Sequence, residues 1–295
     1  MRNWDGWDAI ASLACNIFKA SYFDQKITVP FLGRVMNQAC ASLYYWNGKD
    51  MYIGKFPNNT EHQHHVIQIG IGVTAPFRLQ VGGTDYDFRA VIIAPNVPHK
   101  VDDYGEWQMM LHIEPYSLIG TQLLTTYLKD QQFKEIGFES IKPFLPEINC
   151  FVERIHTRER AKILFDDIIY NLIDTPMKPS SVDDRIRAAL EMLNHMPIKK
   201  ISAKALAVAI GLSESHFAHL FKCQIGIPVR RYLLWLRLRN AVEHIIKGRT
   251  FTNAAHHAGF SDSAHLSRTF KRMSGMTLTN YLKKSQFIQA IFCPD

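Results

Sequence analysis

A stretch of about 48 residues that begins at Ile201 recurs, with changes, from Phe251. GLSESHFAHLFK in the first copy is answered by GFSDSAHLSRTFK in the second, with one inserted residue. A Phe-Lys pair, a glycine and a Tyr-Leu pair then follow at matching positions in both copies. This repeat constrains the fold more than any other feature, because it indicates two copies of one supersecondary unit.

Each copy has the pattern of two short helices joined by a tight turn. Gly211 and Gly259 can take the positive φ that such a turn needs, and Ser213 and Ser261 stand where N-caps belong. In the second helix of each copy apolar residues recur at i and i+4, so one face packs inward and a polar, basic face stays free. Such a face fits the major groove of DNA. The predicted base-reading residues are Ser215, His216, Ala218, His219, Ser263, Ala264, Ser267 and Arg268.

The segment between the copies predicts one connecting helix. From Pro228 to Gly248 it would hold about 19 residues and span roughly 28 Å, against the separation of about 34 Å between recognition helices on one face of a duplex. Its apolar residues run nearly all round, as expected of a helix packed between two small units. A helical bundle without nucleic acid is the alternative, but it does not require duplicated turn glycines and caps.

Positive charge is concentrated in the repeat. Residues 181–295 carry 17 Lys and Arg against 7 Asp and Glu, and the preceding 180 carry 17 against 20, in a chain of formal net charge +7. A local excess of this kind is expected of a surface that binds phosphates. The predicted phosphate-binding residues are Lys200, Lys204, Lys222, Arg230, Arg231, Lys271, Arg272, Lys283 and Lys284. Double-stranded DNA is therefore the predicted partner.

The last hundred or so residues resemble the DNA-binding domain of the AraC/XylS family of bacterial transcription regulators. The resemblance rests on the run AAHHAGFSDSAHLSRTFKRMSG, on RLRNA in the connecting segment, and on the Phe-Lys, Gly and Tyr-Leu series in both copies. Family members commonly have arginine where this chain has His219, and a larger side chain where it has Ser215. Neutral histidine cannot make the bidentate contact of arginine to guanine, so Arg268 becomes the main candidate for base specificity.

Residues 39 to 114 have a strand-like pattern. Short runs rich in β-branched and aromatic residues, from ASLYYW to WQMMLHIEP, are separated by Asn, Gly, Asp and Pro and predict a sandwich or a small barrel. Helical patterns follow over 117–128 and 148–173. The apolar stripe of the second helical segment packs on its own domain or forms a homodimer seam. The family resemblance implies a cupin-like β-barrel followed by dimerising helices.

The chain is thus predicted to be an α+β multidomain protein. Its predicted parts are an extension of unassigned role over 1–38, a cupin-like effector and dimerisation domain over 39–175, a linker over 176–182, and an all-α DNA-binding domain with two helix-turn-helix units over 183–295.

Histidines gather in the strand-like region. Cupins that bind metal place an HxH pair and a distant histidine on separate strands, and His62, His64 and His99 resemble that set. The carboxylate that usually follows is absent, so a metal-free effector pocket is the main prediction, with a metal at these three residues and ordinary surface histidines as the alternatives. The predicted pocket residues are His62, His64, His65, Gln68, His99 and His112.

No nucleophile elbow, paired carboxylates or phosphate loop is present, so the chain is not predicted to be an enzyme. Five cysteines without paired spacing favour free thiols and a cytoplasmic location, and no apolar run is long enough to span a membrane. We therefore predict a ligand-responsive transcription regulator that binds two adjacent major grooves, with homodimerisation and RNA polymerase as a further partner implied by the resemblance. A cupin-type metal-binding protein or enzyme with a DNA-binding tail, and a nucleoid-type binder without sequence preference, are the alternatives.

Overall fold

The computed structural model describes residues 41–46, 48–55, 59–153, 156–173, 182–279 and 288–292. For Asn194, His195, Lys200 and 288–292 it describes the backbone alone. The predicted extension over 1–38, residues 176–181 of the predicted linker, and Lys283 and Lys284 lie outside the described residues.

Two sheets form the N-terminal domain. The larger has seven strands in the order β10-β1-β2-β8-β3-β6-β9, and the smaller has three in the order β5-β4-β7. The strands are β1 (Ala41–Trp46), β2 (Lys49–Gly54), β3 (Ile67–Gly72), β4 (Phe77–Val81), β5 (Thr84–Phe88), β6 (Ala90–Ile93), β7 (His99–Asp102), β8 (Gln108–Ile113), β9 (Phe133–Glu135) and β10 (Ile288–Phe292). The domain is β-rich as predicted, and hydrogen bonds among the described strands define two sheets without closing them into one barrel.

Alternating side chains on the larger sheet face two separate cores. On the central strand β8, Met109 and Leu111 belong to the core on the helical side, and Met110 belongs to the core between the sheets. Ile69 of β3 faces the helical side in the same way. Because both faces of these strands are buried, runs such as IQIGIG carry almost no charged or strongly polar residue.

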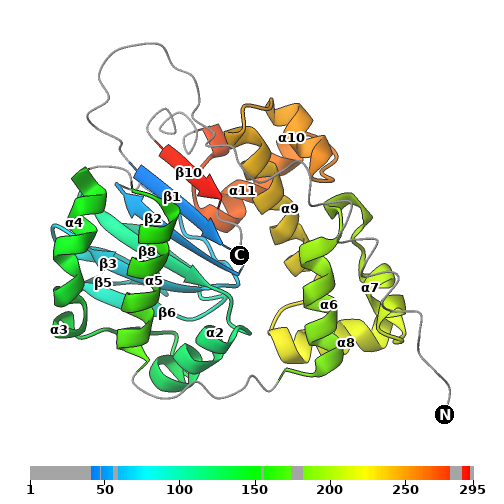
Figure 1. Cartoon of the computed structure of the whole chain (residues 1–295), viewed down its shortest axis with the longest axis horizontal. Helices are drawn as coiled ribbons and strands as arrows, with labels where there is room; N and C mark the ends of the chain where they lie inside the picture. The colour runs from blue at the N-terminus through cyan, green and yellow to red at the C-terminus, as the bar shows by residue number, and fades with distance from the viewer. Residues whose placement is uncertain are drawn as a thin grey trace.

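Helices cover the outer face of the larger sheet (Figure 1). They are α2 (Leu118–Leu123), the π-helical turn η1 (Leu124–Leu128), α3 (Phe138–Ile141), the 3-10 turn η2 (Lys142–Phe144), α4 (Leu145–Glu153) and α5 (Arg158–Leu172). Phe151 of α4 and Phe165 of α5 pack into the core beneath them. The helix predicted over 117–128 is confirmed as α2 and η1.

The single helical stretch predicted over 148–173 is wrong, because the structure has two helices there. α4 ends at Glu153, and α5 begins after Thr157, whose side chain accepts a hydrogen bond from the backbone N–H of Arg160. A side chain that caps the new helix satisfies one of its free N–H groups and so favours a restart at this point.

The apolar stripe of α5 packs mainly within its own domain. Leu164, Ile168 and Leu172 are buried in the helical-side core, whereas Ile163 is 61% exposed. Homodimerisation through this helix therefore stays a prediction, and a partner could contact only its exposed residues, such as Ile163.

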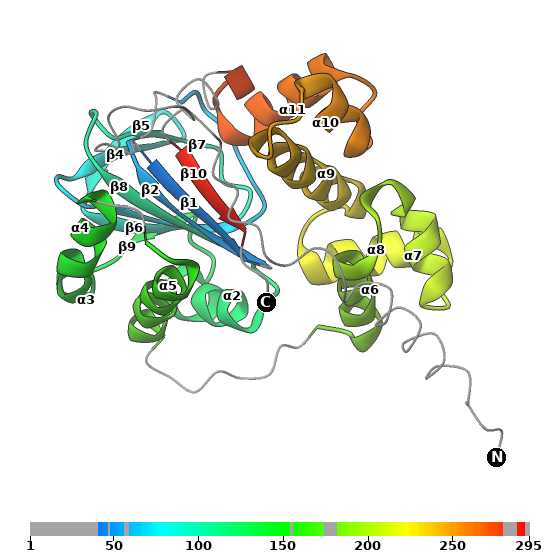
Figure 2. The same ribbon diagram turned by 45° about the horizontal axis from the view of Figure 1, so that its top comes forward.

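The C-terminal half is helical except at its end. Its elements are α6 (Asp184–His195), the 3-10 turn η3 (Ile198–Lys200), α7 (Ala203–Ala209), α8 (Glu214–Ile225), α9 (Val229–Ile246), α10 (Phe251–His257) and α11 (Ser263–Ser274). The connecting helix α9 begins after Pro228, which is its N-cap, and runs between the α7–α8 and α10–α11 pairs (Figure 2). No helix in the described part of the chain is long and apolar enough to cross a membrane.

The end of the chain returns to the N-terminal domain. Strand β10 pairs in parallel with β1 at the edge of the larger sheet, with Ala41 opposite Ile288. The domain predicted over 183–295 therefore contributes a strand to the preceding domain. A parallel pair between distant segments leaves no local turn signal by which sequence could have placed it.

Candidate nucleic-acid interface and inter-domain cavity

The first unit has the predicted turn and cap. Gly211 follows α7 with φ +71°, and Ser213 accepts a hydrogen bond from the backbone N–H of His216 at 3.3 Å to begin α8. Phe217 and Phe221 are fully buried in the unit's core. Because they occupy one face of α8, the opposite face is left to solvent. Of the predicted base-reading residues in this unit, Ser215, His216 and His219 are exposed and Ala218 is half-buried.

The second unit repeats this arrangement with a different cap. Gly259 has φ +81°, but Asp262, not Ser261, caps α11 by accepting from the backbone N–H of His265 at 2.6 Å. That hydrogen bond to the ionised carboxylate lowers the pKa of Asp262. The prediction of Ser261 as cap is therefore wrong by one residue, because the inserted residue shifts the start of the helix.

The outward face of α11 is the more basic of the two. Ala264 and Arg268 are exposed, Ser263 and Ser267 are half-buried, and the Ser267 hydroxyl donates to the Ser263 carbonyl at 2.8 Å. No ion pair involves Arg268 within the described part of the chain, so its guanidinium is free to make a bidentate contact.

The predicted phosphate-binding residues whose side chains the structure describes divide into two groups. The exposed ones are Lys204, Lys222, Arg230, Lys271 and Arg272. Arg231 instead lies against the N-terminal domain, where its Nη2 donates to the Gln63 amide oxygen at 3.3 Å in the amide orientation that satisfies both groups of Gln63. Arg231 is therefore a residue of the domain interface in this arrangement.

Aromatic and charged side chains join the two domains along α9. Tyr232 contacts the Tyr116 hydroxyl through a hydrogen bond and donates to Glu114 at 3.5 Å. Arg239 donates to the Trp46 carbonyl at 2.9 Å and lies over the ring of Tyr45. These contacts place one side of the connecting helix on the edge of the β-domain.

His65 also belongs to this interface. Its ring stacks edge-on against Trp235, with 4.5 Å between ring centroids, and burial lowers its pKa to about 3. Unlike the other predicted pocket histidines His62, His64 and His112, His65 does not line the cavity between the domains, because its ring packs against α9.

A cavity of about 180 Å³ lies between the domains. From the N-terminal domain it is lined by Leu43, Tyr45, Asp50, Tyr52, Asn59, His62, His64, Val66, Gln68, Val101, Met110 and His112. From the C-terminal domain it is lined by Trp235, Leu238, Arg239, Val242, Phe270, Met273, Ser274 and Met276. Most of the lining is apolar, and α9 and α11 form one wall.

A row of polar side chains crosses the cavity floor. Asp50 on β2, His112 on β8 and Gln68 on β3 are register partners across the sheet, and all three line the cavity. Asp50 Oδ1 lies 2.8 Å from His112 Nδ1, and Gln68 Oε1 lies 3.3 Å from His112 Nε2. The row continues to His64, whose Nε2 is 2.8 Å from Gln68 Oε1. Polar groups held this way on an otherwise apolar surface can orient a ligand.

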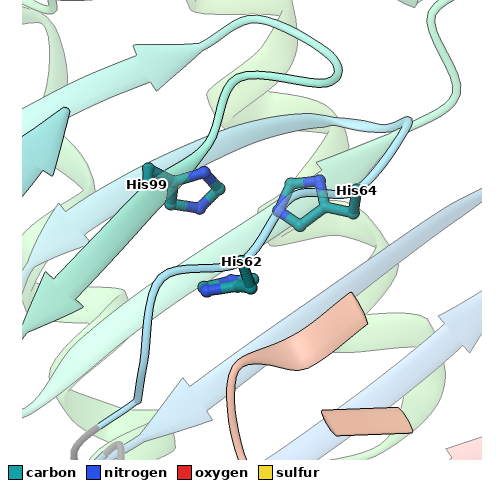
Figure 3. A group of neighbouring side chains, drawn as sticks. All are labelled: His62, His64 and His99. Carbon is teal, nitrogen blue, oxygen red and sulfur yellow. The ribbon is translucent and has the colours of Figure 1, made fainter. Parts of the chain in front are cut away.

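Three histidines meet at one end of this row. His62 and His64 precede β3, His99 opens β7, and an isolated bridge joins the backbones of His62 and His99 with two 2.9 Å hydrogen bonds. The three rings gather around one space (Figure 3). Burial lowers the pKa of each, to about 3 for His99, and the neighbouring imidazoles lower them further. All three are therefore neutral near pH 7.

The structure thus places His62, His64, His99, Gln68 and His112 close together. Sequence reasoning missed the residues that complete the cavity, chiefly Asp50, Trp235 and Arg239. Asp50 left a signal, since a carboxylate stands on the inward face of a buried strand. The other two residues lie on a helix that is apolar nearly all round and so shows no distinct inward face.

Known proteins resemble the chain in both halves. Residues 206–284 match the family model described as a helix-turn-helix domain. The probable transcriptional regulator LumQ of Photobacterium leiognathi is 29% identical over 182 residues, which cover 61% of this chain and 64% of that protein. The chain therefore spans less than two thirds of the length of this relative.

Solved structures of ToxT from Vibrio cholerae share the overall arrangement. One superposes with a TM-score of 0.52 at 12% identity, covering 81% of this chain and 98% of that one. Another, bound to (E)-4-(8-methylnaphthalen-1-yl)but-3-enoic acid, has a TM-score of 0.50 at 12% identity and covers 80% and 98%. At this identity the likeness shows the fold, a β-rich N-terminal domain followed by a helical helix-turn-helix domain.

Proposed function

We propose that this chain, which belongs to the AraC/XylS family of transcription regulators, binds double-stranded DNA through both helix-turn-helix units and responds to a small molecule held between its domains. The observation that carries the proposal is that α11, the predicted recognition helix, presents Arg268 to solvent while Phe270 and Met273 of the same helix line the inter-domain cavity. A ligand in the cavity and a base pair in a groove would therefore contact one rigid element.

The DNA-binding part of the proposal rests on the two capped recognition helices. α8 and α11 each begin at a side-chain cap, end at a glycine with positive φ, and bury two apolar residues at i and i+4. With those faces buried, the polar faces are the ones that can enter adjacent major grooves. Exposed Lys222, Lys271 and Arg272 stand near the ends of the same helices, where phosphate contacts would position them.

The ligand that suits the cavity is an organic anion with a large apolar body. The walls offer aromatic and methionine side chains, and Arg239 supplies a cation whose guanidinium has donors beyond the one used on Trp46. The acid bound to ToxT combines a carboxylate with a naphthalene ring system, which is the same chemical class. Such a ligand would bridge the sheet and α9.

The regulator proposal is tested by selecting genomic DNA fragments on the full-length protein at near-physiological salt and sequencing them. Enrichment of sites with two half-elements about 10 base pairs apart is expected, because each unit reads one turn of the duplex. Equal recovery of all fragments would favour the nucleoid-type alternative. Recovery of none, with the segment 182–295 also failing to bind DNA, would overturn the proposal.

A cytoplasmic location, homodimerisation and contact with RNA polymerase are further parts of the proposal that follow from the family. The rival of a cupin-type enzyme with a DNA-binding tail is not favoured by the comparisons, since the matched relatives are regulators.

A further inference from the structure

We infer that His62, His64 and His99 form a binding site for one divalent transition-metal ion on the wall of the inter-domain cavity. Each offers one ring nitrogen, and these nitrogens all lie within 4.8 Å of one another. Ligands at about 2.0 to 2.1 Å from a tetrahedral ion are separated by less than this, so small side-chain adjustments would close the set.

Hydrogen bonds to the backbone decide which nitrogen of each ring is available. Nδ1 of His62 lies 3.0 Å from the Thr60 carbonyl, Nδ1 of His64 lies 3.2 Å from that of Val66, and Nδ1 of His99 lies 2.9 Å from that of Val97. A carbonyl oxygen only accepts, so Nδ1 carries the proton in the neutral rings of His62 and His99, whereas Nε2 of His64 faces a second acceptor, Gln68 Oε1, at 2.8 Å. Nε2 of His62 and Nε2 of His99 are therefore lone-pair donors, with the orientation that outer hydrogen bonds impose on metal-bound histidines.

One of these ring nitrogens is buried and has no partner among the described residues that would explain it. Nε2 of His99 is buried, and within the described part of the chain no hydrogen-bond partner satisfies it. A buried acceptor without a partner destabilises the folded protein, and a bound cation would supply the missing partner. Nε2 of His64 lies 2.8 Å from Gln68 Oε1, which places the proton on Nε2 in the metal-free protein. A cation bound at Nε2 would move that proton to Nδ1, which faces the Val66 carbonyl.

The donor set indicates the kind of ion. Three neutral imidazoles and an amide oxygen carry no negative charge, which excludes the oxygen-rich carboxylate sites that Mg²⁺ and Ca²⁺ need. Imidazole suits Zn²⁺, Fe²⁺, Co²⁺, Ni²⁺ and Cu²⁺, and three histidines leave the fourth position of a tetrahedral ion to the Gln68 amide oxygen or to a further ligand. We therefore expect the site to bind Zn²⁺, with Co²⁺ as a spectroscopic substitute.

The site also touches the second helix-turn-helix unit. Gly275, the C-cap of α11, accepts hydrogen bonds from the backbone N–H and the hydroxyl of Thr60, at 2.8 and 2.9 Å. A Cβ atom on Gly275 would lie 2.7 Å from the His62 ring. Because the C-terminus of a helix favours positive charge, a cation held by His62 would stabilise the docking of α11 on this segment.

The test begins with the full-length protein stripped of metal by a chelator and then dialysed. Titration with Zn²⁺ by calorimetry is expected to show one tight ion per chain, and Co²⁺ is expected to give the visible absorption of a nitrogen-bound site. His64→Gln, at a half-buried position, is expected to remove the tight ion, and His99→Gln is expected to do the same. Exposed His216→Gln is the matched control and should bind the ion as the unchanged protein does.

Two readouts keep the inference falsifiable if a variant is damaged. Circular dichroism of each variant without metal checks its fold, and Zn²⁺ should raise the melting temperature and slow amide exchange over 59–65 in the unchanged protein but not in His64→Gln. Absence of tight Zn²⁺ or Co²⁺ binding, or binding that survives both His64→Gln and His99→Gln, would overturn the site. The metal titration needs no DNA, so a site that binds metal in a protein that selects no DNA would leave this inference standing and remove the proposed function.

Discussion

At the scale of single residues, one buried carboxyl group stands out at the domain interface. Burial raises the pKa of Glu114, although Tyr116, Arg239 and Tyr232 favour its ionised form. Burial also raises the pKa of both tyrosines well above their ordinary value, so they act as hydroxyl donors throughout the neutral range. The interface therefore holds a carboxyl group that gives up its proton less readily in the folded chain.

This raised pKa predicts a specific pH dependence of stability. Well below pH 4.5, the ordinary value, Glu114 is protonated in both the folded and unfolded states. As pH rises above this value, the unfolded chain loses the proton while the folded chain still holds it, so the folded state loses stability relative to a neutral variant until the folded-state pKa is passed. We expect the melting temperature of Glu114→Gln to rise relative to that of the unchanged protein as the pH increases above 4.5. Glu139→Gln, at an exposed carboxyl, should show no such trend, and a constant difference for Glu114→Gln would contradict the prediction.

A second residue-scale prediction concerns base recognition. Arg268→Ala should weaken binding to the preferred duplex by about 1 to 3 kcal/mol and leave scrambled duplexes unchanged, because its guanidinium contacts a base edge. Lys271→Ala, one helical turn away, should weaken all duplexes alike and reduce the salt slope by about 1. Dissociation constants measured for both duplexes at several salt concentrations separate the two effects. A uniform loss in Arg268→Ala would show that the residue contacts phosphate instead.

At the scale of elements, the two helix-turn-helix units differ in what surrounds the glycine that ends the second helix. Gly226 and Gly275 end α8 and α11 with φ of +82° and +70°, as the repeat predicts. A Cβ added to Gly226 would meet nothing within 4 Å, whereas one on Gly275 would lie 2.3 Å from the Thr60 carbonyl. The repeat therefore explains why both positions are glycine, and docking on the β-domain adds a second reason only at Gly275.

Because of this difference, alanine substitutions at Gly226 and Gly275 form a matched pair of variants. Gly226→Ala should cost about 1 to 2 kcal/mol of unfolding free energy, because alanine is strained in the left-handed region. Gly275→Ala carries the same strain and also a clash, so it should destabilise the protein further and speed amide exchange over 59–65. Chemical denaturation and hydrogen exchange of both variants check this. Equal effects in the two would mean that α11 does not dock on Thr60 in solution.

At the scale of the whole molecule, the inter-domain cavity joins the two proposed activities. Its floor comes from β2, β3 and β8 and its roof from α9 and α11, so any occupant touches both domains. A ligand could bind more tightly when the two domains enclose the cavity than when they are apart. Such a ligand would shift the population toward the enclosed arrangement, by an amount set by the difference between the two affinities. DNA binding and ligand binding would then be linked in both directions.

The cation in the cavity predicts the charge of the ligand. Acids with a fused-ring apolar body should bind the full-length protein more tightly than their primary amides, because Arg239 can pair with a carboxylate. Arg239→Met, which keeps the apolar stem, should lose this preference, with a fall in acid affinity of about tenfold or more. Calorimetry with each acid and amide pair measures it. Equal binding of acid and amide by the unchanged protein would show that Arg239 serves only the domain interface.

The sequence by itself determined the two helix-turn-helix units, because their signals are local. The turn glycines, the Ser213 cap and the buried aromatic residues of α8 all act within a few residues of one another. Most strands of the β-domain and the histidines of its pocket could be predicted from the sequence for the same reason, because alternation along one strand is visible in a short window. The cap of α11 was misplaced only where the inserted residue changed the spacing.

Only the tertiary structure decided how these parts meet. It brought α9 and α11 over the histidines, turned His65 and Arg231 into the interface, and returned β10 to the first sheet. Arg239 and Trp46 are joined across 193 positions of the chain. Contacts of this range leave no periodicity or turn signal in the sequence, because they depend on how finished elements pack and not on the conformation of any one segment.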